Sequence, residues 1–118
     1  MTDTPESAKP ALDMLRGVGG DDMVAMLMRT FVQFVEERVA KLTEEAGAER
    51  WSEVGSIAHA IKSSARQLGA LALADACADT ETAARGDDPA SAASGVVRIQ
   101  HEFENARPWM DALANGPA

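Results

Sequence analysis

The sequence predicts an all-α protein, an antiparallel up-down four-helix bundle with a short additional N-terminal helix. Three observations predict this fold. Ala is abundant while β-branched runs are missing, apolar residues recur at spacings of three and four, and Gly and Pro cluster between these stretches. A length of 118 residues suits one domain. We expect residues 1–8 to be disordered, residues 9–114 to form the bundle and residues 115–118 to be a C-terminal tail.

The N-terminal part of the chain predicts a short helix followed by a long one. The short helix is expected over residues 10–16, and the Gly-Val-Gly-Gly stretch at residues 17–20 ends it. The carboxylates of Asp21 and Asp22 can cap the next helix, which is predicted to run to about Ala46. Its apolar positions form one stripe: Val24, Met28, Phe31, Val35, Val39 and Leu42.

Two further amphipathic helices are predicted in the C-terminal part. One covers residues 70–85, and the other runs from the turn at residues 86–89 to about Leu113, with a kink expected at Pro108. The turn also supplies an Asp that can cap the last helix. Their inward-facing positions are Leu73, Cys77, Thr80, Ala84, Val96, Ile99, Phe103, Ala106, Met110 and Leu113.

The composition argues against several classes of function. The formal net charge is −8 and no cluster of Lys and Arg is present, so neither nucleic acid nor an anionic membrane surface is an expected partner. A single Cys excludes an intramolecular disulfide and a multi-cysteine metal site. No apolar run approaches the roughly 18 residues that a membrane span requires, and residues 1–10 are too polar for a signal peptide. We therefore expect a cytoplasmic protein.

The second long helix separates an apolar face from a small, polar one. It is predicted from Glu49 or Ser52 to Leu68, and Gly69 ends it. Its inward stripe is Val54, Ile57, Ile61, Ala65 and Leu68. On a projection at about 100° per residue, His59 lies roughly 160° from the centre of this stripe and points away from the core. The residues that share its side are Gly55, Lys62, Ser63 and Arg66.

An exposed histidine with a lysine one turn away has a chemical use. A neutral imidazole nitrogen can attack an electrophilic phosphorus while the other ring nitrogen carries the proton. An acceptor beside that second nitrogen would fix the tautomer, and a cation beside the reacting nitrogen would offset charge on the phosphoryl oxygens. Because Lys62 follows His59 by three residues, its ammonium can reach a group attached to the ring.

Residues 59–70 read His-Ala-Ile-Lys-Ser-Ser-Ala-Arg-Gln-Leu-Gly-Ala, and Leu73, Cys77 and Glu81 follow. This pattern resembles the histidine-containing phosphotransfer (HPt) domain of multistep phosphorelays. The family pattern is His, any residue, an aliphatic, Lys, Gly, two small residues, two variable residues, an aliphatic and Gly. The similarity in helix layout extends from about residue 11 to residue 114. The one departure is Ser63, where the family usually has Gly.

The resemblance implies a role for particular residues. His59 corresponds to the phosphoacceptor, Lys62 to the lysine that contacts the phosphoryl group, and Glu81 to a position, usually Gln or Glu, that hydrogen-bonds the histidine from the neighbouring helix. Its projection places Glu81 at the edge of an apolar face, where it can reach across a helix–helix seam. The expected partner-binding residues are Gly55, Ser63, Arg66 and Gln67.

The resemblance also implies the partners. It points to a phosphorelay carrier that exchanges phosphoryl groups with response-regulator receiver domains or a hybrid histidine kinase. The receiver would contribute Mg²⁺, and no cofactor of the chain's own is expected. Nothing in the sequence suggests an ATP site, so we expect no kinase activity. Four helices can close a core alone, which favours a monomer.

Two other functions stay open from the sequence. A non-catalytic module of the same fold would dock or sequester a receiver, and Ser63 is the best support for it. A metal or redox bundle lacks the paired carboxylate-plus-histidine helices. In addition, the positions of His59, Cys77 and His101 have no spacing typical of a metal site. Cys77 is expected in the core and His101 on the surface.

The first long helix is apolar over more than one stripe. The additional positions are Met23, Met26, Val32 and Phe34. They are either buried under the short N-terminal helix or exposed near His59 as a patch that docks a receiver.

Overall fold

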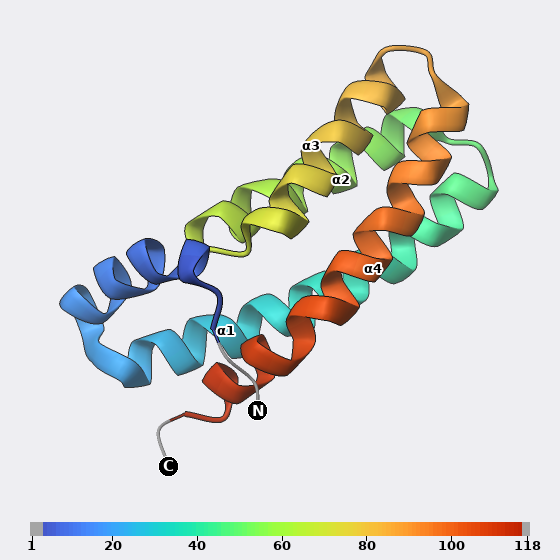
Figure 1. Cartoon of the computed structure of the whole chain (residues 1–118). Coiled ribbons are helices and arrows are strands. Elements are labelled where there is room, and N and C mark those ends of the chain that lie inside the picture. The colour runs from blue at the N-terminus through green and yellow to red at the C-terminus, as the bar shows by residue number, and fades with distance from the viewer. Residues whose placement is uncertain (1–3, 117–118) are drawn as a thin grey trace.

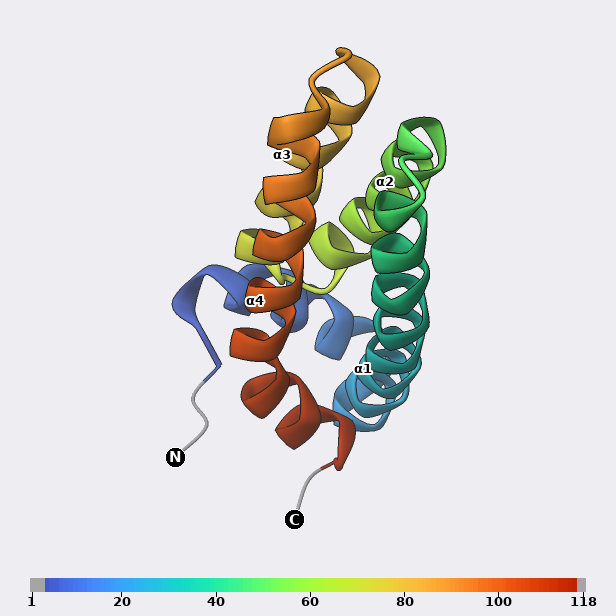
Figure 2. The same cartoon turned by 90° about the vertical axis from the view of Figure 1, so that its right-hand side faces the viewer.

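Four helices, each antiparallel to the next, enclose one apolar core (Figure 1). The computed structural model describes residues 4–116. Its elements in chain order are the 3₁₀ turn η1 (Glu6–Ala8) and the helices α1 (Lys9–Gly47), α2 (Trp51–Gln67), α3 (Leu71–Arg85) and α4 (Pro89–Ala114). Each helix packs on the next and α4 packs on α1, with α1 and α2 on one side and α3 and α4 on the other (Figure 2). The predicted all-α four-helix bundle is confirmed.

A kink at Gly20 divides α1 into a short N-terminal arm and a long helix. Gly20 has φ 72° and ψ −171°, which a residue without a Cβ adopts at little cost. The predicted break therefore exists, but helical backbone continues through residues 17–19, so the arm is longer than the expected 10–16. The Asp21 carboxylate, which we expected to act as a cap, accepts a hydrogen bond from Arg16 Nε across the kink at 2.8 Å.

The segment before α1 includes a 3₁₀ turn, in a stretch (residues 1–8) that we expected to be disordered. Residues 1–3 lie outside the described part, but residues 6–8 form η1 and Ala8 is fully buried. Ala8 packs on Gly69, where a Cβ would lie only 2.7 Å from the Ala8 Cα. Gly69 also has a positive φ of 81°. The turn is held by the contact of Ala8 with Gly69, 61 positions later in the chain. The polar sequence of the turn itself could not reveal this contact.

The core is formed by the apolar stripes that the sequence predicts, with Cys77 fully buried among them. Burial raises the pKa of the Cys77 thiol to about 12, so at neutral pH it is a protonated, unreactive side chain. The additional apolar positions of α1 differ in burial. Val32 is buried and Phe34 half-buried, whereas Met26 is 54% exposed.

The last helix begins at a cap and continues through its proline. Asp88 Oδ1 accepts a hydrogen bond from the backbone N–H of Ser91 at 3.2 Å, which confirms the predicted Asp cap. α4 runs past Pro108 to Ala114, and Trp109 and Met110 directly after the proline are buried. Of the expected C-terminal tail, residues 115 and 116 are described and lie beyond α4, and residues 117 and 118 lie outside the described part. Within residues 4–116, none of the helices combines the length and the apolarity that a membrane span would need.

The contact between α3 and α4 depends on Gly95. A Cβ at this position would lie 3.0 Å from the Thr80 Cβ and 3.2 Å from the Thr80 Cα. Thr80 is fully buried, and its hydroxyl donates a hydrogen bond to the Ala76 carbonyl at 2.7 Å. The two helices can therefore approach this closely only because Gly95 has no side chain.

We expect Gly95→Ala to lower the free energy of unfolding by about 1–3 kcal/mol, because the added methyl group must push α4 away from α3. Gly17→Ala is the matched control, since Gly17 is also helical and its Cβ would meet no atom within 4 Å. That control should gain about 0.5–1 kcal/mol. Urea unfolding followed by circular dichroism measures the free energy of unfolding of both variants. An equal increase in stability for Gly95→Ala and Gly17→Ala would contradict the prediction.

Candidate functional site

The outward face of α2 presents His59 beside the seam with α3. The inward residues of α2 are buried at the spacing that the sequence predicts, with Ala58 added to them: Val54, Ile57, Ala58, Ile61 and Ala65. These contacts fix the rotation of α2 about its axis and leave the His59 side chain 54% exposed. The outward orientation predicted for His59 is confirmed.

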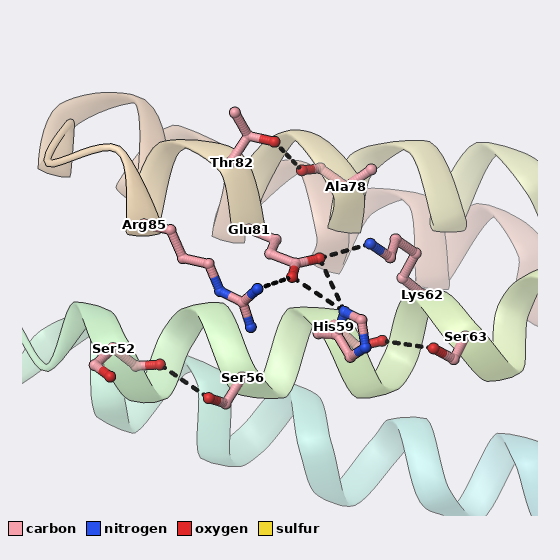
Figure 3. A network of polar contacts seen from close by, with 9 residues as sticks. All are labelled: Ser52, Ser56, His59, Lys62, Ser63, Ala78, Glu81, Thr82 and Arg85. Carbon is pink, nitrogen blue, oxygen red and sulfur yellow. Dashed lines mark hydrogen bonds and ion pairs between the residues drawn. The ribbon is translucent and has the colours of Figure 1, made fainter.

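Glu81 of α3 is the buried centre of a polar network (Figure 3). The residue is only 7% exposed. Its carboxylate lies 2.7 Å from Lys62 Nζ and 2.6 Å from Arg85 Nη1. The His59 Nδ1 atom lies 3.0 Å from Oε2 and 3.2 Å from Oε1. Two cations and an imidazole thus converge on one carboxylate.

The charge state of Glu81 determines the tautomer of His59. Burial by itself raises the pKa of the Glu81 carboxyl. Hydrogen bonds from Lys62 and His59 outweigh this effect, so the pKa lies below its ordinary value and the group is ionised at neutral pH. An ionised carboxylate only accepts hydrogen bonds, so Nδ1 of His59 must carry the proton and donate it to Glu81. The lone pair is then on Nε2, which has no hydrogen-bond partner within residues 4–116.

The cations differ in how they reach this site. Lys62 comes from α2, is 18% exposed and bonds to Glu81, so in this state its ammonium is held at the seam. Arg85 comes from α3, one turn after Glu81, and its side chain is largely exposed. Arg85 was not among the site residues predicted from the sequence. The i, i+4 spacing of Glu81 and Arg85 on one helix was the available signal.

Among the expected partner-binding residues, Gly55 requires a correction. It was expected to share the outward side of α2 with His59, but it is buried, and a Cβ at this position would lie 3.4–3.6 Å from side-chain atoms of Arg85 and Ala84. The physical reason is that α3 crosses α2 here, and the absence of a side chain lets Arg85 lie over the helix. Gly55 is thus a packing position and not part of the free surface.

The other expected partner-binding residues, Ser63, Arg66 and Gln67, are exposed on α2. The Ser63 hydroxyl donates a hydrogen bond to the His59 carbonyl oxygen at 3.2 Å. Its oxygen is therefore held against the helix backbone.

An apolar groove of about 280 Å³ lies between the kinked N-terminal part of α1 and the end of α2. Its lining residues are Leu15, Leu27, Thr30, Phe31, Phe34, Ser64, Gln67 and Leu68. The guanidinium of Arg38 stacks on Phe34, 5.2 Å from the ring centroid. Ser64 and Gln67 follow His59 by five and eight residues, so the groove lies further along the same helix as the imidazole.

Comparison with known proteins gives one clear result. The family model described as "Hpt domain" matches residues 26–109, which is more than half of the chain and contains the whole network around Glu81. The comparisons with curated proteins and with solved structures gave no significant match. Within residues 4–116, no group of three or more His, Cys, Asp and Glu side chains is arranged to hold a metal ion. The helical bundle, the exposed imidazole and the matched segment together show that the chain belongs to the Hpt domain family, the histidine phosphotransfer modules of phosphorelays.

Proposed function

We propose that the chain carries a phosphoryl group on Nε2 of His59, accepts it from the aspartyl phosphate of one receiver domain and delivers it to the aspartate of another. Membership of the Hpt family supports phosphotransfer in general. The observation that carries the assignment to His59 is its Nδ1 contact with buried Glu81, which directs the unprotonated nitrogen to solvent.

The proposed step is an in-line displacement at phosphorus. The Nε2 lone pair forms the P–N bond while the P–O bond to the receiver aspartate breaks, and its electron pair leaves on the carboxylate. Nδ1 keeps its proton throughout, and the positive charge that develops on the ring is balanced by Glu81 at 3.0 Å. No proton transfer is required, which suits a carrier without a general base.

Cations on both sides of His59 support the charge of the phosphoryl group. Lys62 and Arg85 flank the ring, and their bonds to Glu81 keep both near it before the phosphoryl group arrives (Figure 3). Either side chain can turn from the carboxylate toward phosphoryl oxygens, because both are long and flexible. The receiver supplies Mg²⁺ in this proposal. The chain requires no ATP, so it is a carrier and not a kinase.

The proposed receiver or hybrid-kinase partner docks over His59 and the apolar groove. A helix of the receiver inserts apolar side chains into the groove, whose walls include Leu27 and Phe34. Arg38 and Arg66 at this surface favour a partner with carboxylates at the edge of that helix, although the whole chain has a net charge of −8. We propose that the chain acts as a monomer in the cytoplasm.

The non-catalytic alternative rested on Ser63, but the geometry of the Ser63 side chain favours a phosphoryl carrier. A bulky residue one turn after His59 could obstruct a partner, but the Ser63 hydroxyl bonds to the His59 carbonyl and so lies along the helix. This position adds little bulk beyond the backbone. We therefore propose that Ser63 is a tolerated replacement for the usual Gly.

The test of the function is transfer from a receiver. Receiver domains of the source organism, each labelled with ³²P on the aspartate in the presence of Mg²⁺, are mixed with the chain. We expect at least one of them to pass its label to the chain, in a bond that is labile in acid and stable in alkali, as a P–N bond requires. Label that stays on every receiver, or an acid-stable product, would rule out the proposed carrier.

A further inference from the structure

A phosphorelay carrier must release its phosphoryl group as well as accept it, and the release depends on the ring proton. When the P–N bond breaks, the electron pair returns to Nε2. If Nδ1 holds a proton, the leaving group is a neutral imidazole. If Nδ1 has lost it, the leaving group is an imidazolate anion, which is a far poorer one. The affinity of Nδ1 for its proton in the phosphorylated state therefore sets how readily the group moves on.

Glu81 is placed to hold this proton. It is buried, it bonds to Nδ1 at 3.0 Å, and it carries a full negative charge where a neutral amide would offer only a dipole. In the unphosphorylated state that charge is shared with Lys62 and Arg85 at 2.7 and 2.6 Å. These are the charged groups of α2 and α3 that contact it. On α4, Arg98 pairs with Asp79.

Phosphorylation changes the distribution of charge in this network. A dianionic phosphoryl group on Nε2 competes with Glu81 for Lys62 and Arg85, because both have long side chains with several rotatable bonds. Each cation that turns to the phosphoryl group leaves more of the carboxylate charge for the imidazolium. Arrival of the phosphoryl group thus strengthens the hold of Glu81 on the Nδ1 proton.

We propose that Glu81 keeps phosphorylated His59 in its ring-protonated form at neutral pH, so that this chain holds its phosphoryl group briefly and passes it on rapidly. The inference rests on the proposed function and adds the control of the lifetime. In the transfer, the P–N bond breaks, its electrons return to Nε2, Nδ1 retains its proton, and a receiver carboxylate oxygen forms the new P–O bond.

The experiment measures the ring titration of the phosphorylated protein directly. The chain is phosphorylated with phosphoramidate, a small donor that needs no receiver, and the ³¹P resonance is followed from pH 5 to pH 9. We expect Glu81→Gln to lower the titration midpoint by about one pH unit, about a tenfold loss of proton affinity. At pH 8 its phosphohistidine should decay severalfold more slowly, and transfer to a receiver should slow by a similar factor.

Two further variants make the result specific. Glu45→Gln is the matched control, because Glu45 is also a buried carboxylate bonded to a lysine and an arginine, Lys41 and Arg50, but it does not contact His59. It should leave the midpoint unchanged. Arg85→Gln should move the midpoint upward, and its exposed position keeps this test available if Glu81→Gln does not fold.

The outcomes separate this inference from the proposed function. A wild-type chain that is labelled and transfers normally, with the same midpoint in Glu81→Gln or no upward shift in Arg85→Gln, overturns the inference and leaves the carrier intact. A wild-type chain that takes no acid-labile label overturns both.

Discussion

His59→Gln is expected to abolish phosphorylation of the chain, both by phosphorylated receivers and by phosphoramidate. Among the side chains of the Glu81 network that the structure describes, the imidazole is the nucleophile with a free nitrogen lone pair, since Lys62 and Arg85 are both paired with Glu81. Glutamine is close in size, and its amide can donate to Glu81 in place of Nδ1. The fold should therefore be preserved while the nucleophile is lost.

The chain offers a matched control, because it has two histidines. His101 is also exposed, on α4, and has no hydrogen bond to a carboxylate within the described residues. His101→Gln should label like the wild type. Receiver binding, measured by isothermal titration calorimetry, should be unchanged in His59→Gln. Acid-labile label on His59→Gln equal to that on the wild type would sink the assignment and leave the non-catalytic docking module as the better explanation.

Leu27→Glu is expected to reduce transfer from a receiver by about tenfold or more at subsaturating concentration. The substitution puts a carboxylate in the wall of the apolar groove, where a docking helix would have to desolvate it. A tenfold loss corresponds to about 1.4 kcal/mol of binding free energy. Labelling by phosphoramidate should be unchanged, because this small donor reaches Nε2 without occupying the groove.

Val97→Glu is the control for added charge on an apolar surface residue. Val97 is exposed on α4 and does not line the groove. Val97→Glu should leave both transfer from a receiver and labelling by phosphoramidate unchanged. If Leu27→Glu transfers at the wild-type rate with its fold intact, the groove is not the docking surface. If it loses phosphoramidate labelling as well, the substitution has disturbed the site and not the docking.

Much of the site could be predicted from α2 alone. The helical period is a local property of the chain, so the spacing of Val54, Ile57 and Ile61 determines which side of the helix is buried. The same period places His59 on the opposite side, with Lys62 one turn away. The apolar stripes of the other segments and the turns between them similarly predict a bundle of four helices.

Positions that depend on how one helix lies against another could not be predicted in this way. In the helical projection Gly55 lies on the same outward side of α2 as His59. It is nevertheless buried, because Arg85 of α3 lies over it. The N-terminal turn is ordered because Ala8 meets Gly69, and the close contact of α3 with α4 depends on Gly95. None of these contacts has a local signal, since each joins residues that are far apart in the chain.

The sequence by itself determined the helices, the stripes that form the core and the outward position of one imidazole with a lysine beside it. The family resemblance already implied that Glu81 bonds to the histidine. The tertiary structure decided that the bond is made at Nδ1, that the carboxylate is shared with Lys62 and Arg85, and that a groove opens beside α2. The physical reason is that the direction of a side chain on a helix follows from backbone geometry. The register between two helices instead follows from the packing of many side chains at once.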